Sequence, residues 1–456
     1  MGISLFVLVQ SKHVYPDLLL ARMFFSIGGA ATSTMVTAVL PSMMMPSQAF
    51  KEDVTTSPSE PATSTPSPLR QSRASAPSQI AGIVGLFTGC GALLALAAFL
   101  PLPARLQNNG SAPGAALQQS YYIVGMISIV VAIVCSIGLA RLAGEENKGW
   151  RSLIARQGTS STATATTNNS SEESVTKQPS YWSLVRGGVT LGFTDTDIAL
   201  GYLGGFVARA SSVGISLFIP LFVNAYFNSP QVDCGPGHHT DEACVRGYKV
   251  AAMLTGVSQL IALICAPLFG VVDGLAVVRR LPFSATLLVA ALAGIAGNVL
   301  FAKVRNPDPR SAGGSVFGIV ALLGVSQIGA IVCSLSSLAR GIGGHGPSKT
   351  ETRRNSAEEE DDDDDENRAQ PDSETTPFLG TGTSNESRLS SRHHLKGTIA
   401  GLYSLFGGAG ILLLTKLGGA LFDSTTPGAP FYLLAGFNGV LFLAVVVLGS
   451  LRVMRS

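Results

Sequence analysis

Residues 315–339 read SVFGIVALLGVSQIGAIVCSLSSLA, a run without a single charged side chain. About 20 apolar residues are enough for one helical crossing of a lipid bilayer. On either side of this run, eight further stretches of the chain have a similar length and are similarly apolar. Together the nine runs occupy roughly 18–40, 80–102, 121–140, 198–227, 250–272, 283–302, 315–339, 397–422 and 431–451.

The length and composition of these runs show whether they are helices or barrel strands. Backbone polar groups cannot stay unpaired in lipid, so a spanning segment must be a helix or a strand of a closed barrel. Barrel strands are shorter and alternate apolar with polar residues. The runs here are continuous and rich in Gly and Ala. We therefore predict an all-α polytopic membrane protein with about nine transmembrane helices in a lipid bilayer.

Three polar segments interrupt the apolar runs, and one of them, residues 144–190, separates the runs into two groups. Residues 46–79 are rich in Ser, Thr and Pro, and residues 341–395 contain a long acidic run, so both are typical of disordered loops. We predict a partial N-terminal transmembrane bundle in residues 1–143, a central linker in residues 144–190, and a six-helix transmembrane bundle in residues 191–456.

The distribution of Lys and Arg predicts the orientation. Short basic segments beside the spans, Arg279–Arg280 and Lys396 among them, gather on one predicted side. Because positive residues favour the cytoplasmic side, we predict a cytoplasmic linker and C-terminus. The membrane would be the plasma membrane, or a vacuolar or other endomembrane. The formal net charge of +2 gives no basis for a nucleic-acid partner.

This orientation has consequences for the opposite side. Cys234 and Cys244 would share an outer loop where oxidation is permitted, which favours a local disulfide. The sequon at Asn109 would also lie outside and accept a glycan, whereas the sequon at Asn168 would not.

The first residues suggest an incomplete set of helices. Residues 2–10 are apolar but too few to cross a bilayer. They are typical of the end of a helix whose beginning is absent. Three spans before the linker and six after it fit a protein of twelve helices that lacks the first two to three.

A short sequence occurs twice. Residues 256–265 read GVSQLIALIC and residues 324–333 read GVSQIGAIVC. Both segments enter from the same predicted side, so Gln259 and Gln327 should lie at a similar depth. Internal duplication, which is common in transporters, and coincidence in a Gly- and Ile-rich alphabet both remain open.

Several motifs follow one another along the chain. Arg22 precedes a run of small residues, Cys90 lies in a glycine-rich stretch, and Ala266–Gly270 is followed by Asp273. In this order the motifs resemble the major facilitator superfamily, and Arg22 with its small residues is similar to the fourth helix of the family. A glycine-rich stretch resembles the antiporter motif of the fifth helix, with Cys90 at the proline position of that motif. Ala266–Gly270 with Asp273 resembles the loop after the eighth helix of the family. Residues 198–227 resemble the seventh helix of fungal members, and residues 397–423 resemble the eleventh.

The resemblance implies helical bundles of the facilitator type that enclose a central cavity. It implies a secondary active or facilitative transporter that moves a small organic solute by alternating access. Any driving force would come from a gradient of a solute or of a coupling ion such as a proton. The glycines at 82, 85, 89 and 91 would serve close helix packing.

Arg209 and Arg22 are the charged site candidates. Arg209 lies near the middle of a span, where a cation costs at least ~2.5 kcal/mol unless it faces protein or water. It would contact substrate, or it would pair with a structural partner. Arg22 lies near the start of its span and would either contact substrate, as the resemblance implies, or extend to the interface.

Gln259, Gln327 and Asn224 are the uncharged candidates. The resemblance places them on helices that line the cavity, where they would bind substrate. Alternatively, they would bond between helices at roughly 0.6 kcal/mol each.

No enzyme class is favoured. All six histidines lie outside the predicted spans, and no metal-ligand spacing occurs, so we predict no cofactor. The alternative to a transporter is a transport-inactive receptor or scaffold whose long cytoplasmic loops bind partners.

Overall fold

The computed structural model describes residues 2–11, 13–43, 68–99, 102, 105–106, 112–138, 181–227, 241–278, 284–343 and 395–455. In these residues the regular structure is helical throughout, without a strand. Nine helices of this part are long and apolar enough to cross a membrane, which confirms the predicted all-α polytopic fold. They are Tyr15–Val39, Ala76–Phe99, Gly114–Gly138, Thr196–Phe227, Arg246–Val277, Ala285–Ala302, Ser315–Gly343, Lys396–Ser424 and Ala429–Leu451.

Some predictions concern parts of the chain outside this description. They are the disulfide between Cys234 and Cys244, the glycan acceptors Asn109 and Asn168, the Arg279–Arg280 pair, and most of the segments 46–79, 144–190 and 341–395.

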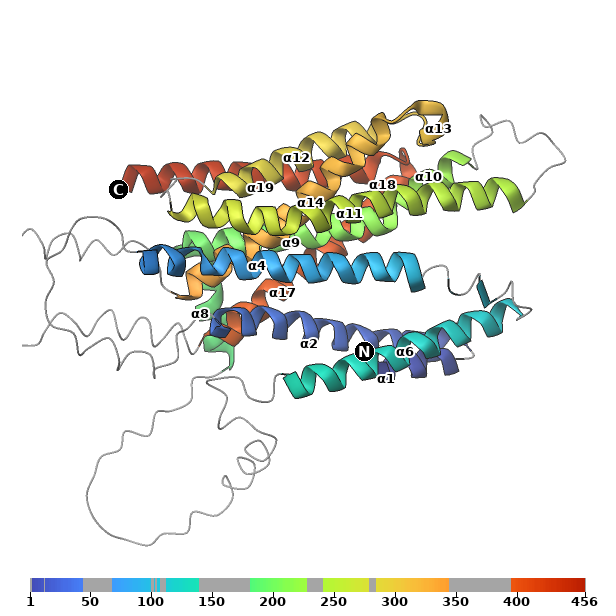
Figure 1. The fold of residues 1–456 in the computed structure, drawn as a ribbon, viewed down its shortest axis with the longest axis horizontal. Helices are drawn as coiled ribbons and strands as arrows, with labels where there is room; N and C mark the ends of the chain where they lie inside the picture. Colours follow the sequence, from blue (N-terminus) through green and yellow to red (C-terminus); the bar gives the residue numbers. More distant parts are fainter. Residues whose placement is uncertain are drawn as a thin grey trace, which may run out of the picture.

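The helices before residue 139 form what we call the N-terminal block. Its elements are α1 (Gly2–Gln10), η1 (Val14–Leu18), α2 (Leu19–Met43), α4 (Pro68–Leu94), η2 (Ala95–Phe99) and α6 (Pro113–Gly138). The apolar residues at the start of the chain form the helix α1, which lies along α6 (Figure 1). The rings of Phe6 and Tyr122 pack there with centroids 5.7 Å apart.

The helices from residue 181 onward form the C-terminal block. Its elements are α8 (Tyr181–Thr194), α9 (Thr196–Val213), η3 (Gly214–Phe218), α10 (Ile219–Phe227), α11 (Asp241–Val278), α12 (Ala285–Ala302), α13 (Pro309–Ala312), α14 (Ser315–Gly343), α17 (Lys396–Leu413), η4 (Leu414–Gly418), α18 (Gly419–Ser424) and α19 (Ala429–Arg455). The central helix α14 packs against α9, α11 and α12.

Several helices extend past the predicted span boundaries, most clearly α4 and α8. The helix α4 begins at Pro68, so the predicted disordered loop 46–79 is helical over its last twelve positions, 68–79. The helix α8 likewise occupies the end of the predicted linker 144–190. Hydropathy marks only the part of a helix that matches the membrane. Both helices continue beyond that part, and residues there pack against other helices. Ser78 of α4 is fully buried, and Gly188 of α8 lies against Leu402 of α17.

The two blocks meet most closely where α4 crosses α11. A Cβ atom on Gly82 would lie 3.0 Å from the Cα atom of Gly270, and one on Gly270 would lie 2.9 Å from the Cα atom of Gly82. The backbones therefore touch, as expected for glycines that serve close packing. In Figure 1, α4 lies beside the C-terminal block, while α1, α2 and α6 lie farther from α11 and α12.

Candidate functional site

A first group of polar side chains joins the blocks at Arg209, and we call it the Arg209 cluster. Arg209 of α9 donates a hydrogen bond from Nη2 to the Oγ atom of Ser33 on α2, at 2.6 Å. Ser404 of α17 donates to the same Oγ atom at 3.2 Å. Thr34 of α2 donates to the Oγ atom of Ser404, also at 3.2 Å. Two helices of the C-terminal block therefore meet α2 through one cation and three hydroxyl groups.

Small residues create the space that Arg209 occupies. A Cβ atom on Gly407 would lie 2.7 Å from the Cγ atom of Arg209, so the glycine lets the aliphatic part of the side chain cross α17. Beside it, the hydroxyl groups of Tyr403 and Ser334 lie 3.2 Å apart. Arg209 remains exposed. Among the described residues, no carboxylate forms an ion pair with it.

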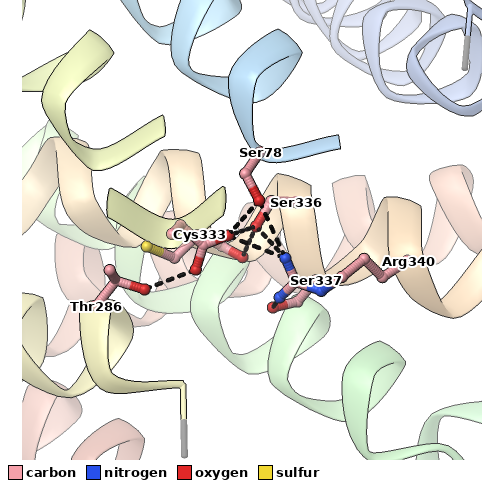
Figure 2. Close-up of polar contacts among 7 residues, drawn as sticks. Ser78, Thr286, Cys333, Ser336, Ser337 and Arg340 are labelled. Carbon is pink, nitrogen blue, oxygen red and sulfur yellow. Dashed lines mark hydrogen bonds and ion pairs between the residues drawn. The ribbon is translucent and has the colours of Figure 1, made fainter. Parts of the chain in front are cut away.

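A second group surrounds the buried carboxylate of Asp273, and we call it the Asp273 cluster (Figure 2). Asp273 is 2% exposed and accepts hydrogen bonds from four side chains on three other helices. They are Ser78 at 2.6 Å, Thr286 at 2.6 Å, Ser336 at 2.6 Å and Arg340 at 2.9 Å.

Arg340 completes the Asp273 cluster. It pairs with Asp273 and donates from Nη2 to the Oγ atom of Ser337 at 2.9 Å. A buried ion pair is tolerated when further hydrogen bonds satisfy both partners, as they do here. Because Ser78 belongs to α4, this cluster also ties the N-terminal block to the C-terminal block.

The two glutamines of the repeated sequence meet. Gln259 donates from Nε2 to the Oε1 atom of Gln327 at 3.3 Å, which confirms that they lie at a similar depth. Gln327 in turn donates to the Oγ atom of Ser212 at 3.1 Å. Ser212 follows Arg209 by three residues, roughly 4.5 Å along α9. The glutamine pair therefore lies close to the Arg209 cluster.

Arg22 and Asn224 lie away from these groups. Both side chains are exposed. Arg22 precedes Ser33 on α2 by eleven residues, or roughly 16 Å of helix. It lies in a surface groove whose other walls are mainly apolar, among them Leu18, Met23 and Ile27. Asn224 follows Arg209 by fifteen residues, roughly 22 Å along the same long helix.

Several members of the clusters were not predicted from the sequence. Ser33, Thr34 and Ser404 carry no signal that separates them from the many helical hydroxyls that bond to their own backbone. Arg340 ends an apolar run and therefore resembles an ordinary interfacial charge. Asp273 was noted only for its resemblance to a loop motif.

The described residues contain no group of three or more His, Cys, Asp or Glu side chains that could hold a metal ion. The chemistry available at the two clusters is hydrogen bonding and charge.

Nine membrane-length helices in the described part define a polytopic α-helical membrane protein, with two polar clusters where its two blocks meet. Residues 1–176 match the family described as "Vacuole effluxer Atg22 like". The match covers the N-terminal block and ends before α8. No curated protein gives a significant match to the chain. The fold and the family match support a transmembrane transporter, which is a non-enzymatic class of protein.

Proposed function

We propose that the chain is a secondary active or facilitative transporter that moves a small organic solute by alternating access. The observation that carries the proposal is Arg209, a cation inside a membrane-length helix, at the junction of two blocks. Its partner there is a neutral hydroxyl group. A charge at this depth is stable only when it faces protein, water or an oppositely charged ligand.

The chemistry of Arg209 favours a solute with a hydrogen-bond acceptor. A guanidinium group presents planar, paired donors that fit a carboxylate or a phosphate. Ser33 and Ser404 add hydroxyl groups from both sides of the junction. Gln327 bonds to Ser212, which lies about one helical turn beyond Arg209 on α9. Gln259 and Gln327 would therefore contact a second polar group of the solute.

Transport would require the two blocks to change their contact around this site. The contacts of α2 with the C-terminal block at the Arg209 cluster are few and polar, so they can break and form again as the blocks rock. The helix α4, in contrast, packs closely on α11 and would stay with it. Rocking of two bundles around a fixed site is the usual form of alternating access.

We place the protein in a vacuolar or other endomembrane, with a cytoplasmic C-terminus. The name of the matching family supports the endomembrane, and the positive residues beside the spans support the orientation. Movement of the solute would follow its own gradient or that of a coupling proton.

Uptake by reconstituted vesicles tests the proposal. Purified full chain in proteoliposomes would receive a defined mixture of isotopically labelled carboxylic acids, amino acids, phosphate esters, sugars and nucleosides. Mass spectrometry would identify what accumulates. We expect at least one solute to enter faster than in empty vesicles. Arg209→Gln should reduce its uptake at least tenfold, and Arg209→Lys should reduce it less because the charge remains.

Lys416→Gln provides the matched control, since Lys416 is another exposed cation within a predicted span. We expect near wild-type uptake from this variant. Uptake that is unchanged in Arg209→Gln, or that falls equally in the control, would exclude Arg209 as the solute contact. Absence of uptake for the whole mixture would favour the receptor or scaffold alternative.

A further inference from the structure

The short helix α8 lies at one end of the bundle, where it contacts α9 and α17 (Figure 1). Its 14 residues extend roughly 21 Å, which is too short to cross a bilayer. Asp195 has an extended backbone and separates α8 from α9. Tyr202 of α9 donates a hydrogen bond to the carbonyl group of Gly188 at 3.4 Å, although on one straight helix the two residues would be roughly 21 Å apart. The chain therefore turns sharply at Asp195, and α8 folds back against α9.

Glycines bring α8 close to the first turns of two spans. A Cβ atom on Gly188 would lie 2.7 Å from the Cδ1 atom of Leu402 on α17, and one on Gly192 would lie 2.7 Å from the ring of Tyr202. Tyr202 and Leu402 each follow the first residue of a membrane-length helix by six positions, roughly 9 Å. The helix α8 therefore lies within roughly 10 Å of the ends of these spans, which is the depth of the boundary between lipid headgroups and acyl chains.

The opposite side of α8 carries two exposed aromatic residues and an exposed cation. Trp182 and Phe193 are 75% and 88% exposed, and Arg186 is exposed between them. Arg186 follows Trp182 by four residues and Phe193 follows Trp182 by eleven, close to one and three turns of a helix, so the three lie on one side. We call this side, formed by Trp182, Arg186 and Phe193, the aromatic face of α8.

The charge on the aromatic face is positive. The helix α8 contains no acidic residue, and among the described residues no carboxylate forms an ion pair with Arg186. Asp195 and Asp197 are the nearest carboxylates along the chain, and they belong to the start of α9, where Asp195 accepts a hydrogen bond from the backbone of Asp197. A guanidinium group fits phosphate oxygens through paired donors, and Trp is enriched at the level of lipid headgroups. The face therefore has the residue types that suit a phospholipid.

We propose that the aromatic face of α8 binds an anionic phospholipid. Arg186 donates to the phosphate of the headgroup, and the rings of Trp182 and Phe193 enter the layer of acyl chains beside it. Burial of the two rings supplies the apolar part of the binding, and the phosphate supplies an acceptor for the guanidinium group. The predicted orientation places α8 in the cytoplasmic leaflet, whose surface is anionic.

Tryptophan fluorescence tests where the aromatic face lies. The chain has two tryptophans, Trp150 and Trp182, so Trp150→Phe leaves Trp182 as the sole emitter. The full chain would be placed in vesicles of phosphatidylcholine and phosphatidylglycerol whose acyl chains carry bromine near the headgroup or near the chain ends. We expect bromine near the headgroup to quench Trp182 roughly twofold more than bromine near the chain ends, and iodide in the water to quench it little. Strong quenching by iodide, or none by either brominated lipid, would overturn the proposal, because Trp182 would then lie in water or against protein.

Thermal unfolding tests the role of Arg186. Purified full chain in neutral detergent would receive phosphatidylglycerol, phosphatidylcholine or inorganic phosphate. We expect phosphatidylglycerol to raise Tm by about 2 °C relative to phosphatidylcholine, because it binds the folded chain. Arg186→Gln should lose at least half of this rise. Arg310→Gln is the matched control and should keep it, since Arg310 is an exposed arginine on another short helix, α13.

No rise in the wild type, or an equal rise in Arg186→Gln, would overturn the proposal. A rise with inorganic phosphate alone that is lost in Arg186→Gln would also overturn it, because the site would then belong to a soluble anion. Neither measurement uses transport. Failure of the proposed function would therefore leave these tests intact, and their failure would leave the proposed function intact.

Discussion

At the scale of single residues, Asp273 shows how an apolar helix keeps a charge. Its carboxylate accepts from Ser78, Thr286, Ser336 and Arg340, so neither the acid nor the cation is left unpaired. The sequence drew attention to Asp273 through a motif, yet it gave no sign that Arg340, which ends another helix, is its partner. Pairing of distant charges depends on how helices pack, and no local pattern encodes it.

Replacing Asp273 tests this pairing. Asp273→Asn would leave Arg340 as an uncompensated buried cation, which is destabilising by about 3–5 kcal/mol. The double variant Asp273→Asn/Arg340→Gln should be more stable than the single variant, because it removes the orphaned charge. Thermal unfolding of the three proteins in detergent measures the difference. A double variant that is no more stable than Asp273→Asn would show that the pair is not a buried unit.

At the scale of elements, the positions of the spans could be predicted and their ends could not. The length of an apolar run reflects the bilayer, so all nine predicted spans are found in the described residues. The helix α4 begins instead at Pro68, inside the predicted loop 46–79, where hydropathy gives no signal. The long helices also contain π-helical turns at η3 and η4, which hydropathy does not reveal. These turns meet where a Cβ atom on Gly418 would lie 3.0 Å from the ring of Phe218.

The crossing of α4 and α11 provides an element-scale prediction. Gly82→Val would force side-chain atoms against the backbone of Gly270, where no side chain can move aside. We expect the blocks to separate and the protein to lose stability by about 1–3 kcal/mol or more, as for overpacked cores. Gly91→Val on the same helix is the control, because no atom of the described residues lies within 4 Å of the corresponding Cβ position; the predicted packing role is therefore wrong for Gly91.

Unfolding temperature and size-exclusion profile in detergent would compare these two variants. Equal behaviour of Gly82→Val and Gly91→Val would contradict the close contact of α4 with α11.

At the scale of the whole molecule, burial is highest in two spans of the C-terminal block and lowest in α2 and α6. In the apolar windows of α14 and of the long helix from Thr196 to Phe227, 61% and 56% of the residues are buried. The corresponding share is 6% in the spans of α2 and of α6. The C-terminal block therefore has its own core, into which α4 also packs, with Ala81 fully buried. The helix α2 joins this core only through a small polar contact.

The contact between the blocks marks the limit of prediction from this sequence. The repeated GVSQ sequence allowed Gln259 and Gln327 to be placed at one depth. Arg209 and Ser33 are 176 positions apart, and no repeat or motif connects them. Arg209 itself could be singled out because a charge in an apolar run is costly, but its neighbours depend on the arrangement of helices.

Under the proposed alternating access, α2 and α17 separate at the Arg209 cluster when a solute passes. The direct test is the variant Ser33→Cys/Ser404→Cys, at positions whose hydroxyl oxygens lie 3.2 Å apart, in a chain whose six native cysteines are replaced by alanine. Uptake of the labelled mixture by proteoliposomes would be measured after oxidation and again after reduction. We expect a disulfide that abolishes uptake and a reductant that restores it. Uptake at the wild-type rate by the cross-linked protein would show that the two blocks do not move apart here during transport.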